Sequence, residues 1–64
     1  MQYKEAIKLQ IGEKVVHKYY GDIILIKNVY AYRNPRNFLD TVYIEGISED
    51  GYNVKYTHKE VFKY

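Results

Sequence analysis

An unbroken apolar run, Ile23 to Ile26, is the feature that most constrains how this chain folds. The run lies within residues 22–32, which are rich in isoleucine, valine and tyrosine and show neither a helix cap nor helical periodicity. That composition is typical of a β-strand. A continuous run suits a strand that is buried on both faces, or one that bends sharply through a small barrel. We therefore predict a long strand in an all-β fold.

Four more segments have the pattern of strands. They are residues 14–18, 39–47, 52–57 and 61–64. Alternation places Val42 and Ile44 on one face of their strand, and it predicts that Tyr52, Val54 and Tyr56 face inward. Asp50-Gly51 between two of these segments predicts a tight hairpin, because glycine accepts the positive φ that such turns require.

Two loops and one helical turn separate these strands. Pro35 and its neighbouring asparagines predict a loop over residues 33–38. Thr57 and Glu60 have the spacing of a capping box, which predicts one helical or 3₁₀ turn before the last strand. This order of elements is that of a five-stranded SH3-like barrel, whose closure would remove the exposed sheet edges.

With 64 residues the chain forms one domain. We assign residues 11–64 to the barrel and residues 1–10 to an N-terminal extension, with an extended segment or one irregular turn. Gly12-Glu13 then forms a turn into the first strand. The chain has no run of about 18 apolar residues, so we predict no membrane span.

The amino-acid composition excludes some kinds of site and function. No cysteine is present, which excludes disulfides and thiolate zinc sites and fits a cytoplasmic protein. The core must therefore be aliphatic and aromatic, and nine tyrosines contribute to it. The formal charge of +2 is too small to indicate nucleic-acid binding by itself.

We expect neither catalysis nor a cofactor or metal. The two histidines, His17 and His58, lack the close spacing of metal ligands. We expect His17 to be a half-exposed strand residue and His58 a solvated turn residue. Ser48 is the only serine and lies at the predicted hairpin tip, so a catalytic triad would have to be built from turn residues. Glu49 and Asp50 are typical of the solvated tip of a hairpin.

The stretch IGEKVVHKYYGDIILIKNV, residues 11–29, resembles the opening of Tudor-like, SH3-fold domains of the CarD family and of the C-terminal domain of UvrD-type helicases. The matching positions are Gly12, Glu13, Val15, Val16, His17, Tyr20 and Gly21. Residues 52–64 are similar to the end of such domains, and KOW domains share the pattern. The chain differs in having isoleucine where a second glycine is usual, and in the insertion YRNPRN. The resemblance implies a protein-binding module of the transcription or repair machinery, with RNA polymerase as a partner.

We therefore expect a non-catalytic interaction module that binds a protein. The predicted surface is a rim made by the loops KYYG and YRNPRN, and its residues are Tyr19, Tyr20, Tyr32, Arg33 and Arg36. Tyrosines would anchor the partner and arginines would orient it. The structural alternative is that Tyr19 and Tyr20 only cap the open end of the core.

Three other functions stay open. A KOW-like nucleic-acid binder would use the same arginines with Lys14, Lys18, Lys27 and Lys55, and would stack bases on Tyr30, Tyr32 and Phe38. A self-assembling structural protein would pair its tyrosine face with a second copy. A methyl-lysine cage would be formed by Tyr19, Tyr20, Tyr43 or Tyr56 around a cation.

Overall fold

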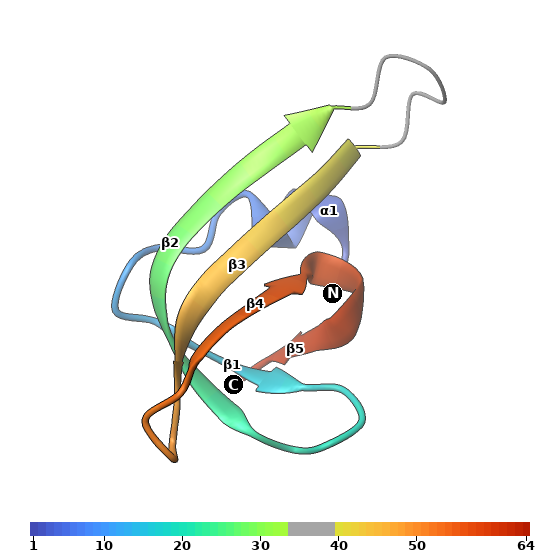
Figure 1. Cartoon of the computed structure of the whole chain (residues 1–64). Coiled ribbons are helices and arrows are strands. Elements are labelled where there is room, and N and C mark those ends of the chain that lie inside the picture. Colours follow the sequence, from blue (N-terminus) through green and yellow to red (C-terminus); the bar gives the residue numbers. More distant parts are fainter. Residues whose placement is uncertain (34–39) are drawn as a thin grey trace.

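Five antiparallel strands form a single curved sheet in the order β4-β3-β2-β1-β5 (Figure 1). The structure is a computed structural model that describes residues 1–33 and 40–64. The elements are α1 (Tyr3–Ala6), β1 (Lys14–His17), β2 (Ile23–Arg33), β3 (Asp40–Ser48), β4 (Asn53–Thr57), η1 (His58–Glu60) and β5 (Val61–Lys63). The predicted all-β class and all five strands are thus confirmed, with closely similar bounds.

The sheet is open. β4 and β5 are its two edges, and over residues 1–33 and 40–64 no ladder joins them. The hydrogen-bonded closure expected of a barrel is therefore not seen. One side-chain contact lies across the opening, since Tyr56 of β4 packs edge-on against His17 of β1 with 4.5 Å between ring centroids. The Lys18 N–H donates to the Glu60 carbonyl at 2.7 Å, which continues the β1–β5 pairing by one residue.

A β-bulge bends the long strand β2. The pairing with β3 shifts between Ile26 and Asn28, so Lys27 is the extra residue. Before the bulge, Ile24 and Ile26 face the core, whereas after it Val29 does. A bulge also strengthens the local twist. The apolar run is not buried on both faces, since Ile24 and Ile26 are buried whereas Ile23 and Leu25 on the other face are half-buried.

The core lies on the concave face of the sheet. Its fully buried residues are Ala6, Val15, Ile24, Ile26, Val42, Ile44 and Val61. Val42 and Ile44 share this face, as predicted. Residues 1–10 differ from the expected extended segment or irregular turn, because Tyr3–Ala6 forms an α-helical turn. Ala6 packs into the core from that turn, so apolar burial explains its position.

The predicted hairpin between β3 and β4 is confirmed. Gly51 has a φ of 87°, and the Ser48 N–H donates to the Tyr52 carbonyl at 2.9 Å. The inward orientation expected for Tyr52 is wrong, since this side chain is 70% exposed. Tyr52 belongs to the turn and precedes β4, so it extends beyond the end of the core. Val54 and Tyr56 do pack against the core, as expected.

The capping box at η1 is also confirmed, because the Thr57 N–H and hydroxyl both donate to the Glu60 carboxylate. The solvated position expected for His58 is wrong, since His58 is buried. Its Nδ1 accepts the Val42 N–H at 3.1 Å. The side chain thereby satisfies a β3 donor just beyond the last β3–β4 pair, and burial follows from that role.

Gly46 of β3 is required for space. A Cβ at this position would lie 2.3 Å from the Leu25 carbonyl oxygen and 2.7 Å from Ile24 Cγ2. Because the nearer atom is backbone, we expect Gly46→Ala to lower the free energy of unfolding by about 3 kcal/mol. Urea denaturation would measure this. Thr41→Ala, on the outer face of the same strand, should cost under about 1 kcal/mol, and equal losses would contradict the packing argument.

The burial of His58 predicts that the folding stability decreases at acid pH. Burial lowers the pKa of its imidazole below 6.5, and the charges of Lys59 and the Met1 amino group lower it further. Stability from the neutral form is therefore fully present above the unfolded pKa of about 6.5 and is lost as pH falls through the folded pKa. Urea midpoints between about pH 7.5 and pH 5 should show the loss.

His58→Asn keeps a hydrogen-bond acceptor near Val42 but does not titrate. We expect it to flatten the pH dependence of the urea midpoint. An acid loss as steep as that of the natural chain would assign the effect to other groups.

Candidate interaction surface

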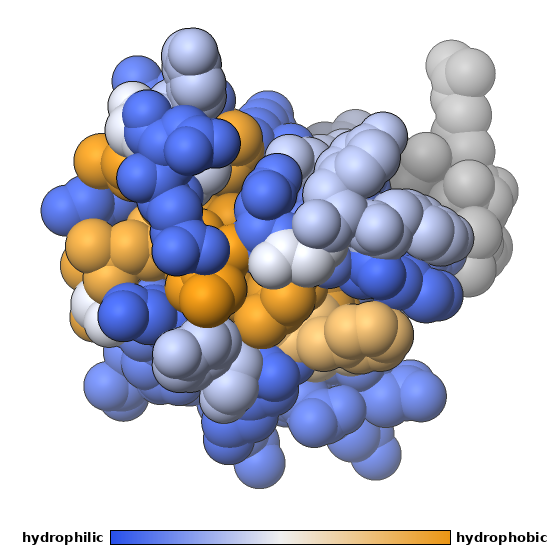
Figure 2. Space-filling model, turned by 90° about the horizontal axis from the view of Figure 1, so that it is seen from below, coloured by the Kyte–Doolittle hydropathy of each residue, from blue (hydrophilic) through white to orange (hydrophobic). Residues whose placement is uncertain are grey.

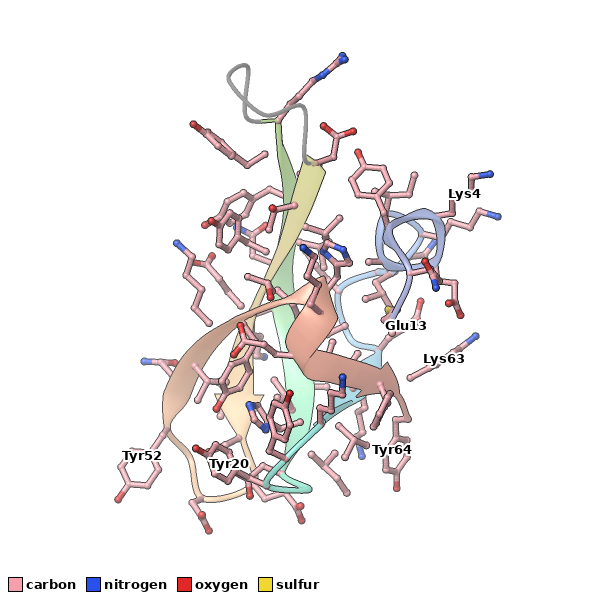
Figure 3. The ribbon with its side chains drawn as sticks, turned by 90° about the vertical axis from the view of Figure 1, so that its right-hand side faces the viewer. Lys4, Glu13, Tyr20, Tyr52, Lys63 and Tyr64 are labelled. Atoms are coloured by element: carbon pink, nitrogen blue, oxygen red, sulfur yellow. The ribbon has the colours of Figure 1, made fainter. Side chains whose placement is uncertain are left out.

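The residues predicted for one rim lie at opposite ends of the sheet. Tyr19 and Tyr20 belong to the loop between β1 and β2, whereas Tyr32 and Arg33 lie at the far end of β2. At about 3.3 Å per residue, the strand separates the two groups by about 30 Å. Figure 3 shows Tyr20 at the end of the molecule remote from the end of β2. Arg36 lies outside the described residues, as does Phe38.

His17 organises the loop that carries Tyr19 and Tyr20. Its Nδ1 accepts the N–H groups of both tyrosines at 3.2 Å. The Tyr20 ring stacks on the imidazole with 4.5 Å between centroids and an angle of 18°. The half-exposed position expected for His17 is wrong, since its side chain is 3% exposed. His17 points inward because it is two residues after Val15 and therefore shares the buried face of β1. The Tyr20 ring covers it.

Gly21 allows this loop to reverse. Its φ is 72°, and its N–H donates to the His17 carbonyl at 3.0 Å. Tyr19 and Tyr20 are nevertheless 74% and 76% exposed. Tyr20 therefore caps His17 on one side and is open to solvent on the other, so capping and a contact role are compatible.

The outer face of the sheet carries an apolar strip at the end formed by β1, β5 and the start of β2. Cross-strand pairing places Val16 beside both Ile23 and Phe62, and places Leu25 beside Ile47. Phe62 is 51% exposed, and the other four are half-buried. Figure 2 shows apolar side chains gathered on the lower face of the molecule. This strip was not predicted, although the unbroken apolar run at residues 23–26 was a signal for it.

The other end of the outer face is aromatic. Tyr30 and Tyr43 are opposite one another on β2 and β3, and their rings stack with 5.5 Å between centroids. Lys55 of β4 lies beside this pair, with Nζ 4.8 Å from the Tyr43 centroid. Tyr32 is one rung further and is 52% exposed. Strand alternation could have grouped these residues.

The four tyrosines of the methyl-lysine hypothesis do not converge. Tyr43 is on the outer face beside Tyr30, whereas Tyr56 is on the inner face against His17. The physical reason is strand parity, because residues paired across β3 and β4 share a face and Tyr56 pairs with Ile44. That arrangement separates Tyr43 from Tyr19, Tyr20 and Tyr56, which all lie against His17.

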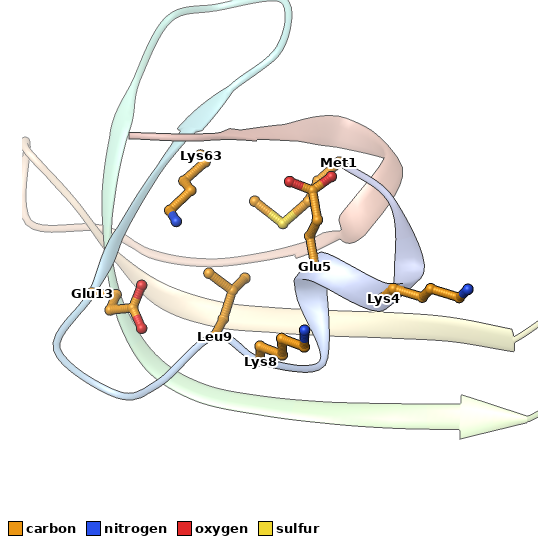
Figure 4. Close-up of a pocket in the computed structure, with 7 residues that line it drawn as sticks. All are labelled: Met1, Lys4, Glu5, Lys8, Leu9, Glu13 and Lys63. Carbon is orange, nitrogen blue, oxygen red and sulfur yellow. The ribbon is translucent and has the colours of Figure 1, made fainter.

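A hollow of about 240 Å³ lies between α1 and β5 (Figure 4). Its lining residues are Met1, Lys4, Glu5, Lys8, Leu9, Glu13 and Lys63. Both carboxylates serve the backbone, since Glu5 accepts the Gln2 N–H and Glu13 accepts the Gln10 N–H. The hollow therefore combines an apolar floor with charges of both signs and holds no convergent set of ligands.

Two features of residues 1–33 and 40–64 bear on other functions. No group of three or more histidine, aspartate or glutamate side chains is placed to hold a metal ion there. No helix in those ranges is long and apolar enough to cross a membrane.

The loop geometry predicts unequal roles for two equally exposed tyrosines. Tyr20→Ala removes a parallel stack on buried His17, and we expect it to cost about 1 kcal/mol of unfolding free energy. Tyr19→Ala should cost less, since its ring is tilted by 56° at 6.0 Å from the imidazole. Thermal denaturation of both variants checks this, and equal losses would argue against the stacking role.

Comparison with known proteins found no match: no family model fits the chain, and neither a curated protein nor a solved structure is similar to it.

Proposed function

We propose that the chain is a small, non-catalytic SH3-like module that binds a protein through the apolar strip. Three features support the SH3-like assignment: the strand order β4-β3-β2-β1-β5, the bulge that bends β2, and the 3₁₀ turn η1 before the last strand. Side-chain packing of Tyr56 on His17 takes the place of a ladder across the open edge.

The apolar strip is the observation that carries the proposal. The solvent face of an antiparallel sheet is normally polar. Here that face presents Val16, Ile23, Leu25, Ile47 and Phe62 in adjacent pairs. Phe62 protrudes most and stands on the edge strand β5, where a partner has access from two sides. Apolar groups clustered in this way favour a protein partner.

The partner class follows from the resemblance to domains that dock on the transcription machinery. RNA polymerase is accordingly the proposed partner, and the cytoplasm the proposed compartment. Tyr64 and Lys14 flank the strip, with Lys14 Nζ 5.5 Å from the Tyr64 ring centroid. Such a rim of aromatic and charged groups around an apolar centre is typical of protein interfaces.

The test is binding of purified bacterial RNA polymerase to the immobilised chain, measured by biolayer interferometry. Phe62→Ser should weaken binding about ten-fold or more, as expected for an exposed aromatic anchor. Tyr52→Ala removes a more exposed aromatic, 70% against 51% for Phe62, from the β3–β4 turn and should leave binding unchanged. Thermal midpoints would confirm that both variants fold.

Two results would overturn parts of this proposal. Absence of binding by the natural chain would remove RNA polymerase as the partner, and a Phe62→Ser variant that binds normally would remove the strip as the surface. Sedimentation velocity at two protein concentrations tests the self-assembly alternative. Association that Phe62→Ser abolishes would show that a second copy covers the strip.

A further inference from the structure

The second feature of the outer face is a tyrosine ladder, formed by Tyr30, Tyr32 and Tyr43. Tyr30 and Tyr43 stack on one another at an angle of 29°, which fixes their orientation before any ligand arrives. Tyr32 follows on β2, opposite Thr41. Tyr30 is 37% exposed and Tyr32 is 52% exposed. Ring surface is therefore available on two successive outward positions of one strand.

A cation is held beside the ladder. Lys55 Nζ lies 5.6 Å from the Tyr30 centroid and 4.8 Å from that of Tyr43. Its pKa is raised, first by a hydrogen bond with Tyr30 and also by Glu45, so the ammonium is charged at every physiological pH. Lys55 is exposed, and it can exchange its ring contacts for an anion from solvent.

A hollow of about 350 Å³ adjoins Lys55. Its lining residues are Lys27, Glu45, Gly46, Asn53, Val54 and Lys55. The Glu45 carboxylate already accepts the Asn28 side-chain N–H at 3.1 Å. The two lysines therefore give the hollow a net positive charge. Arg33 follows Tyr32 on β2 and therefore lies on the opposite face, with its Nε 3.7 Å from Asp40. The cation that the structure places beside the rings is Lys55.

We propose that the tyrosine ladder binds single-stranded nucleic acid, with bases stacked on Tyr30 and Tyr32 and phosphates near Lys55 and Lys27. Aromatic faces with adjacent cations are the usual elements of such sites. The proposal does not depend on protein binding, because the ladder and the apolar strip share no residue.

Ring spacing selects a single strand over a duplex. Tyr30 and Tyr32 are two residues apart on β2, which corresponds to about 6.8 Å along the strand. Stacked bases in a duplex are separated by only about 3.4 Å. Two successive bases reach the two rings only when the strand is extended and unstacked. A single strand adopts that form readily, whereas a duplex would have to open.

The experiment is fluorescence anisotropy with a labelled oligo(dT) of about 12 nucleotides, compared with a duplex of the same length. The natural chain should bind the single strand more tightly than the duplex. Raising salt from about 50 mM to about 200 mM should weaken binding about ten-fold, as expected for two or three phosphate contacts.

Variants assign the binding to the ladder. Tyr32→Ala should weaken binding about five-fold or more, whereas Tyr32→Phe keeps the ring and should bind normally. Lys55→Gln should reduce the slope of the logarithm of affinity against that of salt by about 0.7, the contribution of one phosphate. Tyr52→Ala, with a ring 70% exposed in the β3–β4 turn, is the matched control and should have no effect.

Several outcomes would overturn the inference. They are no binding at about 50 mM salt, equal affinity for the duplex, and equal losses from Tyr32→Ala and Tyr52→Ala. If Tyr32→Ala instead weakens binding of RNA polymerase and the oligonucleotide does not bind, the ladder is a protein surface. Phe62→Ser should leave oligonucleotide binding intact, which separates this test from that of the apolar strip.

Discussion

The bulge at Lys27 is the constraint on which the rest of the structure depends. A strand as long as β2 would keep one set of side chains on one face, but the core of so small a domain needs the sheet to curve around it. The extra residue shifts the alternation by one position, so that Ile24 and Ile26 face the core before the bulge and Val29 faces it after the bulge. It also adds twist. One strand thereby pairs with β1 at one end and with β3 along its length.

Polar side chains complete this core in the absence of any cysteine. His17 and His58 are both buried, and each uses Nδ1 to accept backbone N–H groups. His17 holds the loop that follows β1, and His58 satisfies a donor of β3 beside η1. Both imidazoles must carry their proton on Nε2 to act as acceptors at Nδ1. The two histidines thus replace backbone carbonyls where the strands end.

The outer face divides into two regions with different chemistry. The apolar strip is centred on β1 and β5, and the tyrosine ladder lies on β2 and β3 with Lys55 from β4. The first region is the surface proposed for a protein partner, and the second is the surface proposed for a nucleic-acid strand. Tyr19 and Tyr20 belong to neither region, because the loop that carries them covers His17 and the open end of the sheet.

Alternation and turn chemistry within the sequence determined the five strands, the Gly51 hairpin and the capping box of Thr57 and Glu60, because each depends on residues close together in the chain. The separation of Tyr20 from Tyr32 already follows from the length of the strand between them, whereas tertiary structure alone decided the burial of the histidines and the bulge at Lys27. Those features depend on which strands become neighbours and on which face each residue then occupies. A one-residue shift in register reverses that face, so the local signals of the apolar run and of the tyrosines did not show which residues of different strands share one surface.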